Sequence, residues 1–264
     1  GSILIDNLGV TTTSTGAVIF SPKIYYPFGN KYAYSFYSYY PYKNSDEQTA
    51  AVNDGAYRIT YKLGNTDILW ASSVAEDYNG LTGYNAAYCR AVKLDGVDSQ
   101  YYPKLQYRHL LTALVFRIVG KDNDIENYDV KVTGMQITNT SSTASLCIAD
   151  SKGEQSGVLT GSEDGGSIGF TDLDVAPTTQ ESDLCTILAM PARNYTSAIT
   201  LTVDGANKST VEIPLGSTDG RTKYDAGYIY YFTVTINKPQ EITIVETGLT
   251  EWIPGTNPTP GKEI

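Results

Sequence analysis

The sequence contains one histidine, His109, which limits the chemistry open to the chain. A catalytic triad needs a nucleophile and an orienting carboxylate beside the histidine. The segment Gly165–Gly169 has the spacing G-x-S-x-G, but it leads into the predicted strand Ser167–Phe170 and not from a strand into a helix, so it does not present a nucleophile. One histidine also cannot form the usual zinc site with several histidine ligands. We therefore predict that His109 is a structural strand residue with a hydrogen-bonded ring, and that the chain has no catalytic residue.

Carboxylates are numerous, with 29 Asp and Glu residues, so a pair suited to glycoside hydrolysis is conceivable by count. Nothing in their spacing selects such a pair, and a β-sandwich glycosidase is the least favoured interpretation. Asp122-Asn123-Asp124 and Glu163-Asp164-Gly165 resemble loose calcium loops, but neither has the EF-hand spacing with its closing Glu. We predict solvated turns at both places, and neither a metal nor a cofactor.

The net charge of the chain is −10, and no run of basic residues occurs in it. Phosphate contacts require clustered Lys and Arg, so we expect no nucleic-acid partner. The three cysteines, Cys89, Cys147 and Cys185, are widely spaced and do not form a disulfide framework. We predict three thiols, and the spacing leaves a Cys147–Cys185 disulfide open as the alternative.

No stretch of the sequence reaches the roughly 18 apolar residues that a membrane-spanning helix requires. Gly1-Ser2 is typical of a cloning remnant, so we expect the native protein to begin upstream. An export signal or lipid anchor would then lie in that upstream part.

The elements that position these residues are predicted to be strands. The chain has 22 Tyr, 24 Gly and 11 Pro, a composition typical of short strands joined by turns. Tyr78–Tyr88 is rich in Gly, Asn and Ala and is predicted as a long loop, so little helix is expected. The predicted strands are Lys31–Tyr40, Tyr57–Tyr61, Asp67–Ala71, Leu105–Val119 (as one strand or as two joined by a bend), Tyr128–Val132, Met135–Thr138, Ala144–Ala149, Gly157–Thr160, Ser167–Phe170, Leu184–Ala189, Ala198–Val203, Ser209–Pro214, Tyr228–Ile236 and Glu241–Trp252.

The break Tyr101-Tyr102-Pro103 predicts a domain boundary. We expect an all-β protein with an N-terminal β-sandwich domain at 1–103. A C-terminal β-sandwich domain at 104–264 follows, with strands at regular spacing and an extended tail.

The segment Tyr25–Tyr42 is unusually dense in tyrosine. Its rings could form a platform for stacking sugars, because Tyr combines an apolar face with a polar tip. The candidate residues for such a surface are Tyr34, Tyr37 and Tyr39. The favoured interpretation is that these rings fill the core of a sandwich.

The same segment carries a resemblance to a known family. The chain resembles the fimbrillin-like proteins of Bacteroides and Porphyromonas, the pilins of type V pili. The matching segments, in the family's order, are Ile24–Tyr42, Asp67–Ala71, Arg108–Phe116, Tyr224–Thr235 and Thr250–Gly255. Each motif is weak by itself, and together they span nearly the whole chain.

The resemblance implies two transthyretin-like β-sandwich domains in tandem and a precursor that is an outer-membrane lipoprotein. In the pilus-forming members a protease cleaves after an Arg and removes the first strand of the N-terminal domain. The groove then accepts a strand from the next subunit, which is β-augmentation. About twenty residues precede the tyrosine block here, fewer than in relatives. We expect this domain to lack its native first strand or strands, removed by processing or by cloning; the alternative is a naturally short domain.

The resemblance also implies a donor strand near the C-terminus. The candidate inserting residues are Ile242, Ile244, Leu249, Trp252 and Ile253; the alternative is that this segment closes the C-terminal sandwich. We expect a structural pilus subunit on the cell surface whose partners are other pilin subunits, with the outer membrane reached only through a lipid anchor on the precursor. The second interpretation is a tip adhesin or surface protein that binds host or bacterial glycans or proteins.

Overall fold

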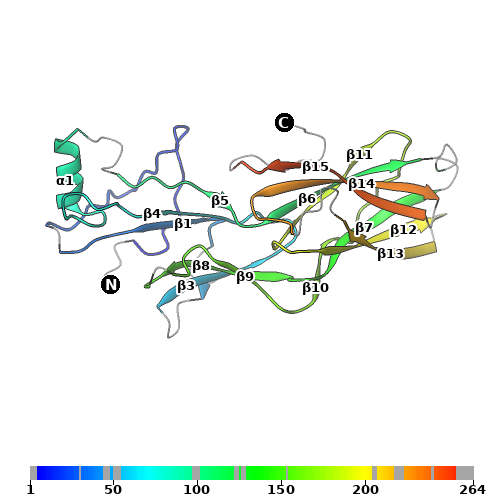
Figure 1. The fold of residues 1–264 in the computed structure, drawn as a ribbon, viewed down its shortest axis with the longest axis horizontal. Coiled ribbons are helices and arrows are strands. Elements are labelled where there is room, and N and C mark those ends of the chain that lie inside the picture. The colour runs from blue at the N-terminus through cyan, green and yellow to red at the C-terminus, as the bar shows by residue number, and fades with distance from the viewer. Residues whose placement is uncertain are drawn as a thin grey trace. The chain divides into compact units, whose positions relative to one another are not determined.

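The computed structural model of the chain describes residues 5–29, 31–43, 48–49, 55–96, 102–121, 125, 129–152, 154–203, 207–216, 223–238 and 241–253. These residues form a predominantly β structure with one short helix (Figure 1). The elements are β1 (Phe36–Tyr40), β2 (Gln48–Thr49), β3 (Ala56–Lys62), β4 (Leu69–Ser73), α1 (Ala86–Leu94), β5 (Arg108–His109), β6 (Thr112–Gly120), β7 (Val130–Thr140), β8 (Thr143–Asp150), β9 (Leu159–Gly161), β10 (Gly166–Phe170), β11 (Ser182–Ala189), β12 (Tyr195–Val203), β13 (Asn207–Leu215), β14 (Tyr228–Lys238) and β15 (Glu241–Glu251). None of the described helical residues could form a bilayer-spanning segment.

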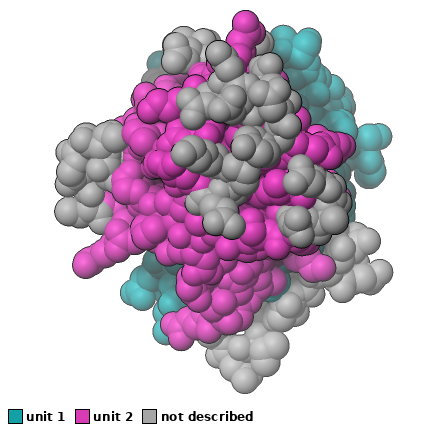
Figure 2. Space-filling model, turned by 90° about the vertical axis from the view of Figure 1, so that its right-hand side faces the viewer, with its two compact units in different colours: residues 1–60, 69–107, 146–158 teal, residues 61–68, 108–145, 159–264 magenta. Residues whose placement is uncertain are grey.

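The chain divides into two compact units that are interleaved in sequence (Figure 2). Unit 1 comprises residues 1–60, 69–107 and 146–158, and unit 2 comprises residues 61–68, 108–145 and 159–264. Strands β3 and β8 each contribute residues to both units. The predicted domains 1–103 and 104–264 stay a prediction.

Unit 2 is a β-sandwich of two four-stranded sheets. Their strand orders are β10-β7-β12-β13 and β11-β6-β14-β15. The central strand β6 is buried along nearly its whole length, which fits its continuous apolar sequence, and it pairs in parallel with β14. Phe116 of β6 stacks on Phe232 of β14 with ring centroids 5.2 Å apart. Ile187 of β11 reaches toward Gly169 of β10, so side chains of one sheet fill the space beneath the other.

The structure corrects the prediction of the strands around Gly134. The sequence predicts two strands, Tyr128–Val132 and Met135–Thr138, but the structure has a single strand, Val130–Thr140. A Cβ at Gly134 would lie 3.2 Å from the carbonyl oxygen of Phe170 and 3.3 Å from the Thr200 side chain. The register with β12 also shifts beside Thr200. Gly134 therefore permits a close approach next to a bulge and does not end the strand.

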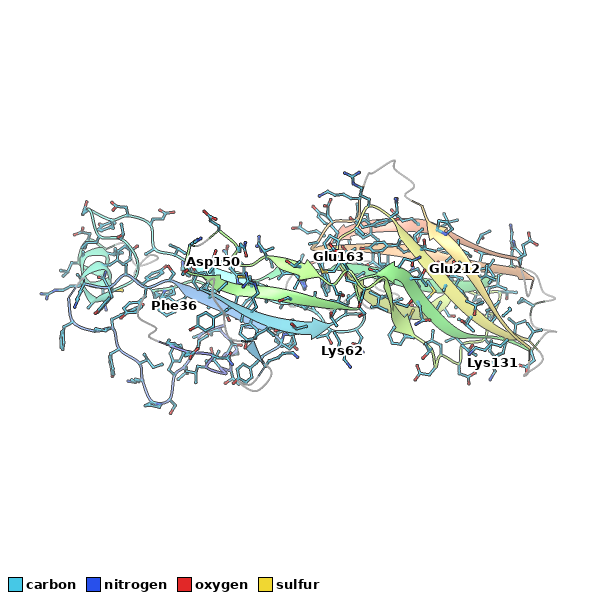
Figure 3. The ribbon with its side chains drawn as sticks, turned by 90° about the horizontal axis from the view of Figure 1, so that it is seen from below. Phe36, Lys62, Lys131, Asp150, Glu163 and Glu212 are labelled. Atoms are coloured by element: carbon cyan, nitrogen blue, oxygen red, sulfur yellow. The ribbon has the colours of Figure 1, made fainter. Side chains whose placement is uncertain are left out.

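Unit 1 contains the antiparallel pair β1–β4, in which Phe36 lies opposite Ser73. Figure 3 labels Phe36 at the start of β1. Helix α1 begins inside the predicted loop Tyr78–Tyr88, which is therefore wrong over its last residues. The helix starts here because the side chain of Asn85 accepts a hydrogen bond from the backbone N–H of Tyr88 at 2.9 Å, an N-cap.

Candidate functional site

Strand β15 is the first candidate for a functional surface. It lies at the end of the strand order β11-β6-β14-β15, antiparallel to β14 (Figure 1). No described strand pairs with its outer edge, and such an edge presents backbone N–H and C=O groups to another chain. Its side chains alternate between exposed and half-buried or buried along all 11 residues. Alternation of this kind gives β15 one face toward the sandwich and one toward solvent.

The five predicted donor residues do not share one environment in β15 and the residues after it. Ile242 and Ile244 are half-buried. Leu249 is 45% exposed and Ile253 is 56% exposed, whereas Trp252 is 2% exposed. Within this chain the segment closes a sheet of unit 2, and its insertion into a second chain stays a prediction.

Trp252 anchors the C-terminal end of β15. Its ring stacks on the ring of His109, with centroids 3.8 Å apart and planes 15° apart. Its backbone N–H donates to the carbonyl oxygen of Gly227 at 2.8 Å. His109 Nδ1 lies 3.0 Å from Oδ2 of Asp67, so the imidazole N–H donates to the carboxylate and fixes the ring beneath Trp252. We call Asp67, His109 and Trp252 the Trp252 anchor.

Three segments of the family resemblance meet at this anchor. Asp67 comes from the segment before β4, His109 from β5 and Trp252 from the segment after β15. Between them, the N–H of Gly227 donates to the carbonyl oxygen of Leu111 at 2.9 Å. The anchor therefore has a structural role within unit 2, which accounts for these motifs without any catalytic step.

The structure corrects one detail at His109. The residue is 5% exposed, as predicted for a structural strand residue. Its ring was predicted to be hydrogen-bonded, and Nδ1 is, but Nε2 is buried with no partner among the described residues. The ring is held by the Nδ1 hydrogen bond to Asp67 and by stacking on Trp252.

The predicted aromatic residues lie mostly inside unit 1. Tyr34 is 8% exposed. Tyr37 and Tyr39 are half-buried, and the Tyr39 hydroxyl donates to Asn7. Rings of this segment that were not singled out are more exposed: Tyr25 is 75% exposed and Phe28 is fully exposed. Whether any of them binds a glycan stays a prediction.

A packing pattern accounts for this difference. Tyr26 packs on Tyr34, with centroids 6.1 Å apart, and on Phe36, at 6.3 Å. Burial raises the pKa of the Tyr26 hydroxyl. Because Tyr26 faces inward in an extended segment, its neighbour Tyr25 faces solvent. Tyr25 follows this alternation with Tyr26, but the fully exposed Phe28 does not, and no signal in the sequence identifies its exposure.

The predicted calcium-like turns have different outcomes. Asp122–Asp124 lies outside the described residues. The Asp164 carboxylate accepts hydrogen bonds from the Ser142 hydroxyl, from the Ser142 N–H at 3.2 Å and from the Gly166 N–H at 3.3 Å. These hydrogen bonds connect Asp164 to Ser142 and Gly166 and stabilise the turn. Among the described residues no three His, Cys, Asp or Glu side chains form a metal-binding group.

These hydrogen bonds make a pH-dependent prediction. The bond from Ser142 is the main cause that lowers the pKa of Asp164 from its ordinary 3.8 to about 2. Because the pKa is lower in the folded chain, the ionised Asp164 stabilises the fold at pH values above its ordinary pKa of 3.8. This stabilisation is lost as the pH falls through about 2. We expect NMR titration of the Asp164 carboxyl to give a midpoint near this value, and Ser142→Ala to raise it. A wild-type midpoint at the ordinary value would contradict this assignment.

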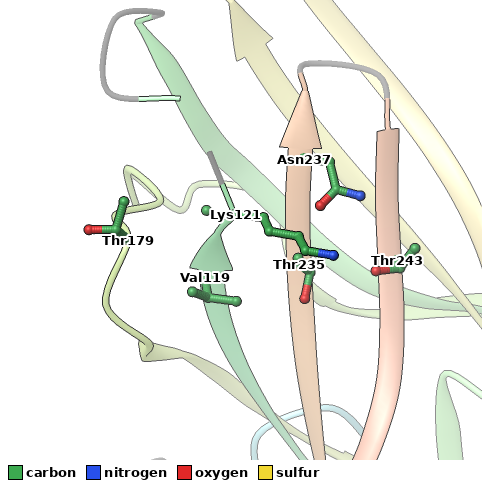
Figure 4. A pocket seen from close by; sticks show the side chains of 7 residues that line it. Val119, Lys121, Thr179, Thr235, Asn237 and Thr243 are labelled. Atoms are coloured by element: carbon green, nitrogen blue, oxygen red, sulfur yellow. The ribbon is translucent and has the colours of Figure 1, made fainter. Parts of the chain in front are cut away.

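A shallow pocket lies at one end of the sheet β11-β6-β14-β15 (Figure 4). It has a volume of about 450 Å³ and is lined by Val119, Gly120, Lys121, Thr179, Thr235, Asn237 and Thr243. Among these described lining residues Lys121 is the only charged side chain, so the pocket presents no acid–base pair of the kind that hydrolysis needs.

None of the three cysteines forms a disulfide. The alternative of a Cys147–Cys185 disulfide is therefore wrong. Cys147 and Cys185 are buried and Cys89 is half-buried. Burial raises the pKa of the Cys185 thiol to about 12, so this residue is a small core side chain and not a nucleophile.

Comparisons with solved structures give distant similarities. A candidate cell adhesion protein from Bacteroides uniformis has a TM-score of 0.49 and 16% identity, covering 83% of this chain and 72% of that one. A fimbrial protein from Bacteroides vulgatus has a TM-score of 0.48 and 15% identity, covering 86% of this chain and 79% of that one. A candidate cell adhesion protein from Bacteroides ovatus has a TM-score of 0.47 and 13% identity, covering 83% and 68%. These similarities are too distant to assign a role to this chain.

The comparison with protein-family models identifies the family of the chain. No curated protein that was compared with the chain matches it. The model of the fimbrillin-like family matches residues 2–252, nearly the whole chain, and confirms the predicted resemblance. Proteins of this family are not enzymes, which confirms the prediction that the chain is not an enzyme. The chain belongs to the fimbrillin-like family.

Proposed function

We propose that the chain is a structural subunit of a fimbrium on the bacterial outer surface, assembles by donor-strand exchange and contributes to cell adhesion. Family membership supports a fimbrial role. The single observation that carries strand exchange is β15, an 11-residue edge strand with alternating burial. An added strand gains affinity from main-chain hydrogen bonds and specificity from alternate side chains that fill pockets.

Several features of β15 suit a strand that changes partners. Glu246 occupies a buried position on its inward face and Gly248 contributes no side chain there. The register with β14 shifts between Tyr231 and Phe232, whose partners are Gly248 and Glu246. Thr247 is therefore an extra residue, a bulge that interrupts the ladder. The hydrophobic attachment of β15 to its own sheet rests on Ile242, Ile244 and the Trp252 anchor.

The finer assignments belong to the same proposal. The sandwich of unit 2 supports two transthyretin-like domains in tandem, with 1–103 as the first and 104–264 as the second. The partners are other subunits of the fimbrium. The precursor is a lipoprotein that reaches the outer membrane through its lipid anchor, and the mature chain lies on the cell surface.

Deletion of Gly248–Ile264 from the full-length precursor tests this function. After treatment with an Arg-specific protease, we expect the wild type to form filaments in electron micrographs and SDS-resistant ladders on gels. The deletion variant should form neither, because it lacks the anchored half of the donor segment.

The control for folding uses the fluorescence of Trp70. Of the 2 Trp in the chain, the deletion removes Trp252 and keeps Trp70. It is buried in unit 1 and donates to the carbonyl oxygen of Ile148 at 2.9 Å. Retained blue-shifted emission together with lost assembly supports strand donation. Loss of both would mean that the segment is needed for folding, and ladders from the deletion variant would contradict the proposal.

A glycan-binding tip adhesin is the second candidate, because Tyr25 is 75% exposed and Phe28 is fully exposed. Sugar rings stack on solvent-facing aromatic side chains. A chain that stays monomeric after confirmed cleavage and binds carbohydrate on a glycan array would favour this function. Tyr25→Ala with Phe28→Ala should then abolish the binding.

A further inference from the structure

The basic charge of the chain is unevenly distributed. Residues 7–45 contain three lysines and no Asp or Glu, whereas the whole chain has 19 basic and 29 acidic residues. Outside this stretch the formal charge is thus 19 minus 3, or 16, basic residues against 29 acidic ones, a net of −13. A stretch without carboxylates in so acidic a protein marks a surface that favours an acidic partner.

The same stretch exposes large apolar side chains in unit 1. Ile24 is 37% exposed, Tyr25 75% and Tyr32 42%, and Phe28 is fully exposed. The ammonium group of Lys31 lies 5.3 Å from the centre of the Tyr32 ring. The described residues of Lys23–Tyr32 belong to no strand or helix. We call Lys23–Tyr32 the basic aromatic segment.

Unit 2 carries a surface of complementary character. Strand β15 contains three Glu and no Lys or Arg, and Glu241 and Glu251 are exposed. On the same strand Val245 is 51% exposed and Leu249 is 45% exposed. Both surfaces therefore combine exposed apolar side chains with charges, positive on unit 1 and negative on unit 2.

We propose that the basic aromatic segment of one copy docks reversibly against β15 of a second copy. The inference rests on the proposed assembly of subunits, and it concerns intact, folded chains before any strand is exchanged. Because the two surfaces differ, the contact is heterologous, and repeating it builds a ring or an open row of subunits. Opposite charges speed the encounter and suppress wrong pairings, and salt weakens this attraction between exposed groups.

Charge exchange tests the contact. Self-association of the chain is measured by sedimentation velocity at low and high salt. One variant reverses the charge of the basic aromatic segment, Lys23→Glu with Lys31→Glu. The other reverses the charge of β15, Glu241→Lys with Glu251→Lys. Each pair alone should weaken self-association at low salt by about tenfold or more. A mixture of the two variants should associate again, because each then meets a complementary surface.

The matched control is Lys152→Glu with Lys208→Glu, two exposed lysines elsewhere whose replacement changes the net charge equally. This control should associate like the wild type. A wild type that is monomeric at low salt, or a control that is weakened as much as the basic-segment variant, overturns the inference. So does a monomeric chain that binds polygalacturonate through Lys23 and Lys31, since the partner would then be an acidic polysaccharide.

The experiment separates this inference from the proposed function. Docking is reversible, salt-sensitive and occurs without proteolysis, whereas strand exchange gives SDS-resistant products. Ladders after proteolysis without salt-sensitive docking would overturn the inference alone. Docking without ladders would support it and contradict donor-strand exchange.

Discussion

Replacing Trp252 with alanine will lower the free energy of unfolding of unit 2 by about 3–5 kcal/mol, the usual cost of truncating a buried large aromatic side chain. Trp252 is 2% exposed and stacks on His109 at 3.8 Å. The truncation removes this stack and opens the buried face of His109 to water. Because Trp252 anchors the end of edge strand β15, we expect this strand to open locally more readily than the rest of unit 2.

Two measurements check this result. Urea unfolding gives the change in free energy, with Leu249→Ala as the control: Leu249 is 45% exposed, and its truncation should cost about 0.5 kcal/mol or less. In Trp252→Ala, hydrogen exchange in Thr247–Glu251 should be faster than in the wild type, and this increase should exceed any increase in the central strand β6. A loss below about 1 kcal/mol for Trp252→Ala would mean that the stack does not hold the strand.

Gly169→Ala will be nearly as disruptive, for a different reason. Gly169 has a φ of +130°, and a Cβ there would lie 2.3 Å from the carbonyl oxygen of Met135 and 2.9 Å from Cδ1 of Ile187. The methyl group would push β10 away from β7 and strain the backbone. Overpacking and the unfavourable φ together should lower the free energy of unfolding by about 3 kcal/mol or more.

A glycine series separates these two costs. Gly165 has a φ of +59° with nothing within 4 Å, and Gly216 has open space within 4 Å and no unusual φ. Gly165→Ala should cost about 1 kcal/mol for its backbone alone, and Gly216→Ala close to nothing. Thermal unfolding of the three variants gives the comparison. Equal losses at Gly169 and Gly165 would contradict the close packing of β10 on β7.

Much of the fold follows from local patterns in the sequence. The alternation Tyr57, Ile59, Tyr61 predicts β3, and the apolar run within Tyr228–Ile236 predicts β14, because side-chain burial in strands has a period of two. Local patterns fail where the reason is tertiary. Gly134 looks like a break in the sequence, and only the approach of Phe170 and Thr200 shows why β7 continues. The start of α1 depends on one cap, Asn85.

The site was partly predictable. The resemblance singles out Asp67, His109 and Trp252 in separate segments, but no local rule predicts that they meet. Asp67 and His109 are 42 positions apart in the chain. Their contact depends on the pairing of the N–H of Leu110 with the carbonyl oxygen of Ile68 at 3.0 Å. Long-range pairing of this kind is set by the whole sandwich, so the anchor emerges only from the structure.

In the proposed donor-strand exchange, β15 leaves its own sheet and completes a neighbouring subunit. Cryo-electron microscopy of assembled filaments, at a resolution that traces strands, tests it most directly. We expect β15 of each subunit to pair with strands of the next subunit, and Trp252 to be no longer stacked on His109 of its own chain. Filaments in which every β15 stays paired with its own β14, as it is in the single chain, would contradict donor-strand exchange.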